Sequence, residues 1–324
     1  MQLVLSRAAF MPLWYTGRIH EPDSTFGFRF ASGYRGAMRH KDGVFFEPLS
    51  LDRQGFRLPA THERAEQRVV LIGGASMVFS YGVAEEDALH TAIRDALSTP
   101  STVVNRAWPG FGLVRSYEAY RRSDVPSAEP VRTVFFVYGE TVEKLQRDIL
   151  QLTSSGGVPE RSREDLFRYS EDMVLPQPLG VMGAALGDWY YRSFLVNRLV
   201  DAVWRIERFV LPVSRRSSPL RREADTQPIT DSDAIVRNWM QSVVDAQGGA
   251  RSVLFVFLPS MDQAFEHDYE RLRSLLPSEC RVLDVRDLFQ PRLGRDSYLA
   301  WGHYRSKVLK RIGHAIAAVF AEDE

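Results

Sequence analysis

The segment Arg68-Val-Val-Leu-Ile-Gly-Gly-Ala-Ser76 joins a short apolar run to two glycines and a serine. An apolar run of this length that ends in glycine is typical of a buried strand in a parallel sheet. The glycines permit a tight turn, so Ser76 would lie at the carboxyl end of the strand, just before a helix. Ligands bind at this edge of open α/β sheets, which makes Ser76 a candidate nucleophile by position alone. The simpler alternative is that Ser76 only caps the helix.

The composition indicates a globular chain without a charge bias. Of its 324 residues 44% are hydrophobic, which suits one large α/β domain or two smaller ones. Lys and Arg together number 41, as do Asp and Glu, so no net charge favours nucleic acid or an anionic membrane. The single cysteine, Cys280, excludes an intramolecular disulfide and a cysteine-rich metal site. We therefore expect neither a cofactor nor a metal ion, and the oligomeric state is left open.

No segment is predicted to cross a membrane. The run Met1–Trp14 is interrupted by Arg7 and Pro12 and has no clear cleavage site, so it resembles neither a signal peptide nor a membrane span. The longer apolar stretch Phe194–Val213 contains several charged side chains, which favour an amphipathic helix instead. The expectation is a cytoplasmic protein.

Strands and helices alternate from residue 67 onwards. After Val69–Ile72, further apolar strands are predicted at Thr102–Val104, Val131–Tyr138, Val253–Leu258 and Val282–Val285. Such alternation predicts an α/β fold in which helices cover a mainly parallel sheet of five strands. Residues 1–66, rich in glycine and aromatic side chains, are expected to form an amino-terminal cap with short strands. Residues 67–324 would form the α/β domain, with a helical and loop insertion at about 151–250.

The loops after the first three strands should meet at one edge of this sheet, where His303 could join them from the far end of the chain. Ser76 could then attack a substrate and His303 could take its proton, while backbone N–H groups near Ser76 and Gly110 hold an oxyanion. The alternative for His303 is a structural role, as a helix cap or packed beside Trp301.

These segments resemble the SGNH hydrolases, also called the GDSL esterase and lipase superfamily. The family's first block has Gly-Asp-Ser followed by aromatic and glycine residues, and this chain has Gly74-Ala-Ser-Met-Val-Phe-Ser-Tyr-Gly-Val83. The second block, commonly Asn-x-Gly-x-x-Gly, corresponds to Asn105-Arg-Ala-Trp-Pro-Gly110. His303 and the helix after it correspond to the last block. The leader ending in Gly55-Phe-Arg57 is similar to the cap of some bacterial members.

The resemblance implies an SGNH-hydrolase-like, three-layer α/β/α sandwich of flavodoxin-like type. It also implies a serine esterase or acyltransferase that acts on an O-acyl ester, for example an O-acetyl group on a glycan. In this assignment Ser76 is the nucleophile, His303 is the general base, and the N–H groups of Ser76 and Gly110 bind the oxyanion. Trp108, Glu140 and Trp301 are expected to line the substrate pocket. The alternatives are that the tryptophans belong to the core and that Glu140 caps the helix that follows it.

Two side chains of the family have no direct counterpart here. The third block supplies an asparagine to the oxyanion hole, and its place is taken by Gly139-Glu140-Thr141. Thr141 is the candidate donor, because an ionised Glu140 can only accept a hydrogen bond.

The acid that usually precedes the histidine is also missing, because its expected positions hold Ala300 and Trp301. Asp296 is the nearest candidate, with Asp284 and Asp287 as alternatives from the end of the last strand. A Ser–His dyad oriented by a backbone carbonyl is a further alternative. The missing groups leave open a second hypothesis, a catalytically inactive SGNH-like protein that binds a glycan or a protein partner.

Overall fold

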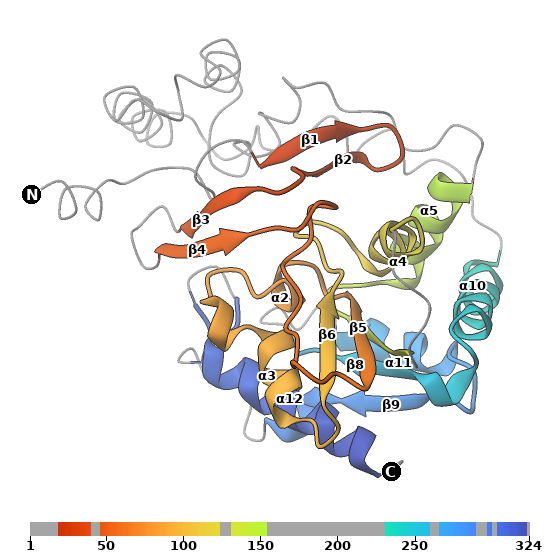
Figure 1. The fold of residues 1–324 in the computed structure, drawn as a ribbon. Helices are drawn as coiled ribbons and strands as arrows, with labels where there is room; N and C mark the ends of the chain where they lie inside the picture. The colour runs from red at the N-terminus through yellow and green to blue at the C-terminus, as the bar shows by residue number, and fades with distance from the viewer. Residues whose placement is uncertain are drawn as a thin grey trace, which may run out of the picture.

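A five-stranded, all-parallel sheet forms the centre of the protein (Figure 1). The computed structural model describes residues 19–39, 46–123, 131–153, 231–259, 266–289, 297–299 and 303–322. Within them the sheet order is β6-β5-β7-β8-β9. Its strands are β5 (Gln67–Gly73), β6 (Ser101–Asn105), β7 (Val131–Val137), β8 (Val253–Phe257) and β9 (Arg281–Asp284). The predicted α/β fold with a parallel sheet is confirmed.

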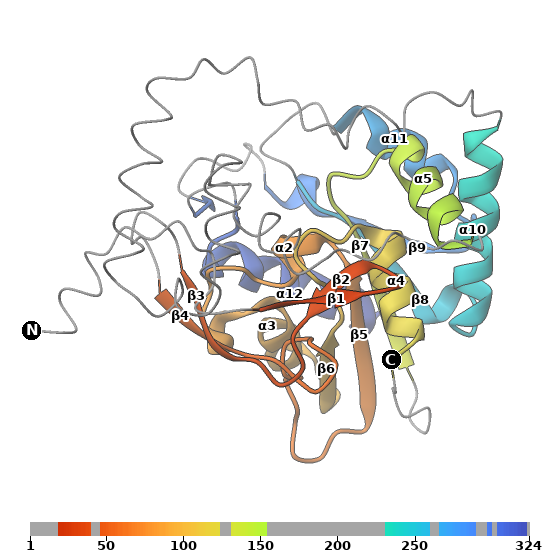
Figure 2. The ribbon, with the colours of Figure 1, turned by 90° about the horizontal axis from the view of Figure 1, so that it is seen from above.

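Helices cover both faces of the sheet, so its strands are apolar on both sides (Figure 2). On one face, α3 (Leu89–Ala96) and α12 (Ser306–Ala321) share a core with alternate strand residues such as Leu71 and Phe136. On the other face, the intervening residues such as Ile72 and Phe135 pack under four helices. These are α4 (Leu113–Arg121), α5 (Val142–Thr153), α10 (Ser232–Ala246) and α11 (Glu266–Ser274). The arrangement is a three-layer α/β/α sandwich of flavodoxin-like type.

The strand order places a switch point at the carboxyl end of β5. The chain runs from β5 to β6 on one side and then crosses to β7 on the other side of β5. Loops that leave adjacent strands in opposite directions open a crevice at such a point, and ligands bind there in open α/β sheets. Ser76 directly follows β5 and therefore lies at this position.

Two antiparallel hairpins precede the sheet and lie at one end of it (Figure 1). They are formed by β1 (His20–Asp23) with β2 (Gly27–Phe30) and by β3 (Arg35–Arg39) with β4 (Phe46–Ser50). Phe28 and Phe30 of this cap are buried in the same core as Phe79 and Phe111 of the α/β region. The cap therefore shares its hydrophobic core with the face of the sheet that α3 and α12 cover.

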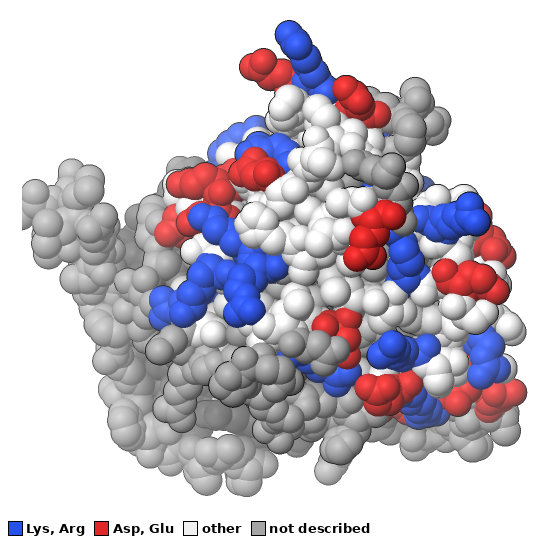
Figure 3. Space-filling model, turned by 90° about the horizontal axis from the view of Figure 1, so that it is seen from below, with Lys and Arg blue, Asp and Glu red and all other residues white. Residues whose placement is uncertain are grey.

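The remaining sequence expectations concern the insertion, the membrane and the surface charge. The centre of the predicted insertion, residues 154–230 with the amphipathic helix Phe194–Val213, lies outside the described residues. Among the described residues, no helix has the length and apolar character to cross a membrane. Figure 3 shows acidic and basic side chains interspersed over one face of the molecule, in line with their equal totals.

Candidate active site

The turn between β5 and the short helix α2 (Ala75–Val78) holds Ser76 at the edge of the sheet. Gly73, Gly74 and Ala75 have φ angles of 85°, 68° and 47°, so three successive residues have left-handed backbone. A Cβ atom on Gly74 would lie only 2.2 Å from Cγ2 of Val78. Glycine is thus favoured at these positions because the backbone is left-handed and because a side chain would clash with its neighbours. Ala75 adopts the same left-handed backbone at a cost of about 1–2 kcal/mol. Such sharp strand-to-helix turns present a serine at the top of a sheet.

His303 reaches Ser76 although 227 positions separate them in the chain. Its Nε2 atom lies 2.9 Å from Oγ of Ser76, a normal hydrogen-bond distance. Both side chains are half-buried, so a substrate could reach them. The ring of Tyr81 packs against the imidazole with a centroid separation of 4.9 Å. The structure therefore brings together the nucleophile and base that the sequence predicts.

Backbone and side-chain hydrogen bonds fix the segment that carries His303. The carbonyl of His303 accepts a hydrogen bond from the N–H of Leu299 at 2.5 Å, and the N–H of Arg305 donates to the carbonyl of Ser297 at 3.0 Å. The hydroxyl of the buried Tyr304 donates to the carbonyl of Pro259, beyond the end of β8. This segment then enters α12, so His303 is anchored on both sides.

Of the three candidate acids, the structure describes only the side chain of Asp284. Asp296 and the side chain of Asp287 lie outside the described residues, as does the predicted pocket residue Trp301. The carboxylate of Asp284 is bound instead by Arg286, whose Nε lies 2.9 and 3.0 Å from its two oxygens. Asp284 is therefore committed to a local ion pair at the end of β9.

Two backbone N–H groups at the switch point have no acceptor among the described residues. They belong to Ser76, in the first turn of α2, and to Gly110, in the loop after β6. Gly110 is exposed and has a φ of 81° in a turn that the N–H of Phe111 closes onto the carbonyl of Trp108. Preorganised backbone donors of this kind stabilise an oxyanion.

The buried side chain of Asn105 ties the loop after β6 to the helix that carries Ser76. Its Nδ2 donates to the carbonyl of Val78 at 2.7 Å, and its Oδ1 accepts from the N–H of Ala107 at 3.0 Å. Asn105 therefore has a structural role, because it fixes the loop after β6 and the helix that carries Ser76 relative to each other.

Thr141 is placed as a helix cap. Its Oγ1 accepts a hydrogen bond from the N–H of Lys144 at 3.1 Å at the start of α5. No described contact directs the hydroxyl of Thr141 towards Ser76.

Glu140 caps a helix too, but the helix is α4, which precedes it in the chain. The side chain is 1% exposed, and Oε1 accepts from the N–H of Leu113 at 2.9 Å. Oε2 lies 3.0 Å from Nζ of Lys144. Burial raises the pKa of Glu140, and the Lys144 ammonium and the Leu113 N–H partly oppose that rise. Glu140 therefore stabilises the loop between β6 and α4 and offers no free surface to a substrate.

Trp108 belongs to the core between the cap and the sheet. Its side chain is 3% exposed, stacks on Phe56 at 4.5 Å, and donates from Nε1 to the carbonyl of Gly55 at 2.7 Å. The expectation that Trp108 lines a substrate pocket is not met, because the indole is enclosed by the aromatic side chains of the cap. The alternative, a core tryptophan, describes its position.

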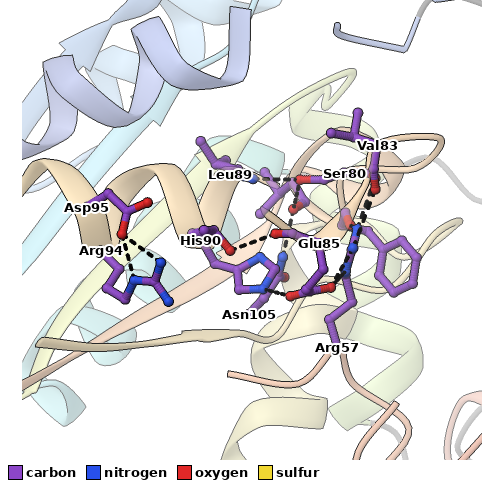
Figure 4. Close-up of polar contacts among 12 residues, drawn as sticks. Arg57, Ser80, Val83, Glu85, Leu89, His90, Arg94, Asp95 and Asn105 are labelled. Carbon is purple, nitrogen blue, oxygen red and sulfur yellow. Dashed lines mark hydrogen bonds and ion pairs between the residues drawn. The ribbon is translucent and has the colours of Figure 1, made fainter. Parts of the chain in front are cut away.

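Sequence reasoning missed the group of charged side chains next to the turn that carries Ser76 (Figure 4). Arg57 is fully buried and donates to the carbonyls of Phe79 and Ser80 and to Oε2 of Glu85. Oε1 of Glu85 lies 2.6 Å from Nε2 of His90, which is also fully buried. Burial raises the pKa of Glu85, but the His90 hydrogen bond and the Arg57 charge outweigh it and bring that pKa to about 2. The Gly-Phe-Arg57 motif of the leader was the only sequence signal for this group.

Comparison with known proteins finds no matching protein-family model and no matching curated protein. The relation to SGNH hydrolases stays a prediction from the residues quoted above. Among the described residues, no cluster of three or more His, Cys, Asp and Glu side chains is arranged to hold a metal ion.

Proposed function

We propose that the protein is a serine esterase or acyltransferase that acts on an O-acyl ester. The observation that supports this most strongly is the 2.9 Å separation between Oγ of Ser76 and Nε2 of His303 at the switch point of the sheet. A hydroxyl within hydrogen-bond reach of an imidazole is the arrangement that activates a serine for acyl transfer. An O-acetyl group on a glycan is the substrate class we favour, by analogy with the SGNH hydrolases that the sequence resembles.

In the proposed reaction, Oγ of Ser76 attacks the ester carbonyl while Nε2 of His303 takes the hydroxyl proton. The negative charge that develops on the carbonyl oxygen is received by the N–H groups of Ser76 and Gly110. His303 then gives its proton to the departing alcohol, which leaves an acyl group on Ser76. Water or an acceptor alcohol, deprotonated by His303, releases this group as an acid or a new ester.

The proposed oxyanion hole has no asparagine at the position of the family's third block. The loss of one oxyanion donor costs about 10²–10³-fold in rate. At that position the chain has Gly139-Glu140-Thr141, where Glu140 is bound by Leu113 and Lys144 and Thr141 caps α5. We therefore expect slow turnover.

The second candidate is a catalytically inactive SGNH-like protein that binds a glycan or a protein partner. It is favoured by the same commitment of Glu140 to helix capping and by the pairing of Asp284 with Arg286. Reactivity of Ser76 distinguishes the two candidates, because a binding protein has no need for an activated hydroxyl.

The test is turnover of p-nitrophenyl acetate by the wild-type protein and by Ser76→Ala and His303→Ala. Matched controls are Ser242→Ala on α10 and His314→Gln on α12, which replace exposed side chains away from Ser76. Esterase activity should fall to the uncatalysed rate in the first pair and persist in the second. Equal turnover in the wild type and Ser76→Ala would rule the esterase out.

A further inference from the structure

The carbonyl groups at the end of α2 are held by side chains from two other parts of the chain. Nδ2 of Asn105 binds the carbonyl of Val78 at 2.7 Å. The guanidinium of Arg57 binds the carbonyls of Phe79 and Ser80 at 2.9 and 3.0 Å (Figure 4). A helix of one turn has little stability of its own, so its orientation depends on such contacts. The direction in which α2 presents its serine is thus set in part by Arg57.

The same guanidinium also fixes the beginning of α3. Its Nε and second terminal nitrogen lie 3.0 and 2.6 Å from Oε2 of Glu85, in the short helix η1 (Glu85–Asp87). The backbone carbonyl of Glu85 accepts a hydrogen bond from Oγ1 of Thr91 at 2.8 Å. The carboxylate atom Oε1 of Glu85 lies within hydrogen-bond distance of Nε2 of His90. His90 and Thr91 are both buried in the first turn of α3. Arg57 therefore links α2 to α3 through the ion pair between its buried guanidinium and the partly exposed carboxylate of Glu85.

The helix α3 in turn supports the segment that carries His303. α12 packs along α3, and at Gly313 the backbones approach so closely that a Cβ atom would lie 3.0 Å from the carbonyl carbon of Ala92. Lys310 of α12 forms an ion pair of 2.5 Å with Asp87 in η1. Since α12 begins just after His303, a shift of η1 and α3 would move the imidazole. Both members of the Ser76–His303 pair are thus connected to Arg57.

The cap holds the backbone before Arg57 in a fixed conformation. Oδ1 of Asp52 accepts the N–H groups of Gln54 and Phe56 at 2.8 and 2.9 Å, which shapes the turn before Arg57. Gly55 in this turn has a φ of 82°, and a Cβ atom there would lie 2.3 Å from the carbonyl oxygen of Phe30. The backbone that leads to Arg57 is therefore tightly constrained by the cap.

We propose that Arg57 is a positioning residue, which the amino-terminal cap supplies to hold Ser76 and His303 in reacting geometry. The inference rests on the proposed esterase function, and Arg57 acts through α2 and α3 without touching the reacting atoms. Its planar fork of five N–H donors serves two carbonyls and a carboxylate at once, which a lysine ammonium cannot do from one position. A positioning role predicts a loss in kcat with little change in KM, because the substrate-binding surface stays in place.

The experiment compares the wild-type protein with Arg57→Lys and, as a matched control, with Arg94→Lys, which replaces the outward-facing partner of Asp95 on α3. Thermal unfolding first establishes that each variant is folded. A misplacement of about 1 Å is expected to slow acyl transfer by about 10²-fold in Arg57→Lys. Arg94→Lys should retain the wild-type kcat and KM. If Arg57→Lys does not fold, Glu85→Gln replaces it in the experiment. This variant weakens the same ion pair, and the expected loss of kcat is smaller.

A second readout does not depend on turnover. The chemical shift of the His303 ring, assigned by comparison with His303→Gln, reports the contact with Ser76, and Ser76→Ala gives its value without that contact. In Arg57→Lys the shift should move towards the Ser76→Ala value. A folded Arg57→Lys protein with the wild-type shift overturns the positioning role, whether or not its kcat has fallen. If the wild-type protein hydrolyses no ester but the shift still moves, the proposed function fails and the positioning role stands.

Discussion

Replacement of Gly74 by alanine probes the turn on which the candidate site depends. Gly74 has a φ of 68°, and an added Cβ atom would meet Cγ2 of Val78 at 2.2 Å and Cβ of Phe136 at 2.9 Å. The left-handed backbone costs a side chain about 1–2 kcal/mol, and overpacking of a core site adds about 1–3 kcal/mol. Together these lower the free energy of unfolding by about 2–5 kcal/mol.

A control at Gly33 separates the two contributions to that loss. Gly33 has a φ of 63°, but a Cβ atom there would meet nothing within 4 Å. Gly33→Ala should therefore lose only the conformational part, about 1–2 kcal/mol. Urea unfolding of the two variants and the wild type measures both values, and the effect of alanine on the unfolded chain is common to both. If Gly74→Ala is no less stable than Gly33→Ala, the turn is not packed as described.

Three further predictions concern polar groups in and beside the core. Glu140→Ala should lower the free energy of unfolding by about 1–2 kcal/mol through loss of the α4 cap, and Glu140→Gln by less because its amide oxygen still accepts; denaturant unfolding measures both. Trp108→Phe should cost about 1–3 kcal/mol in the same assay, since the carbonyl of Gly55 loses its indole donor. The pKa of Glu85 falls from 4.5 to about 2 on folding, so its ionised form adds stability above pH 4.5 that is lost as pH falls towards 2. The stability difference between wild type and Glu85→Gln should therefore shrink over that range, and a pH-independent difference would contradict the assignment.

The fold was predictable because its signals are local in sequence. β7 and β8 are rich in apolar residues, and α5 and α11 follow them along the chain. Parallel strands that alternate with helices allow few topologies, and the carboxyl ends of their strands lie at one edge. The position of Ser76 at the sheet edge therefore follows from the order of the strands and helices along the chain.

The roles of Glu140 and Arg57 could not be read from the sequence in the same way. Glu140 was expected to cap the helix after it or to face a substrate, but it binds the N–H of Leu113, 27 positions earlier. Arg57 meets the carbonyls of Phe79 and Ser80, at 22 and 23 residues of separation. Charged side chains are rarely buried without a partner, but the identity of that partner depends on tertiary packing that no sequence period records.

Trp108 illustrates a further limit. An aromatic residue in a loop near the sheet edge is compatible with a ligand platform or with a core position, and the sequence pattern is the same for both. The cap determines that Trp108 is a core residue, because Phe56 stacks on the indole and the carbonyl of Gly55 accepts its N–H. The cap and the loop lie far apart in sequence, so their packing became visible only in the folded chain.

The central claim, that His303 activates Ser76, is tested most directly by covalent labelling with a fluorophosphonate that reacts with activated serines. Mass spectrometry of the digested protein locates the adduct. The account predicts a single phosphonate on the peptide that contains Ser76, absent from Ser76→Ala and strongly reduced in His303→Ala. An unlabelled wild-type protein, or equal labelling of Ser76 with and without His303, would contradict it.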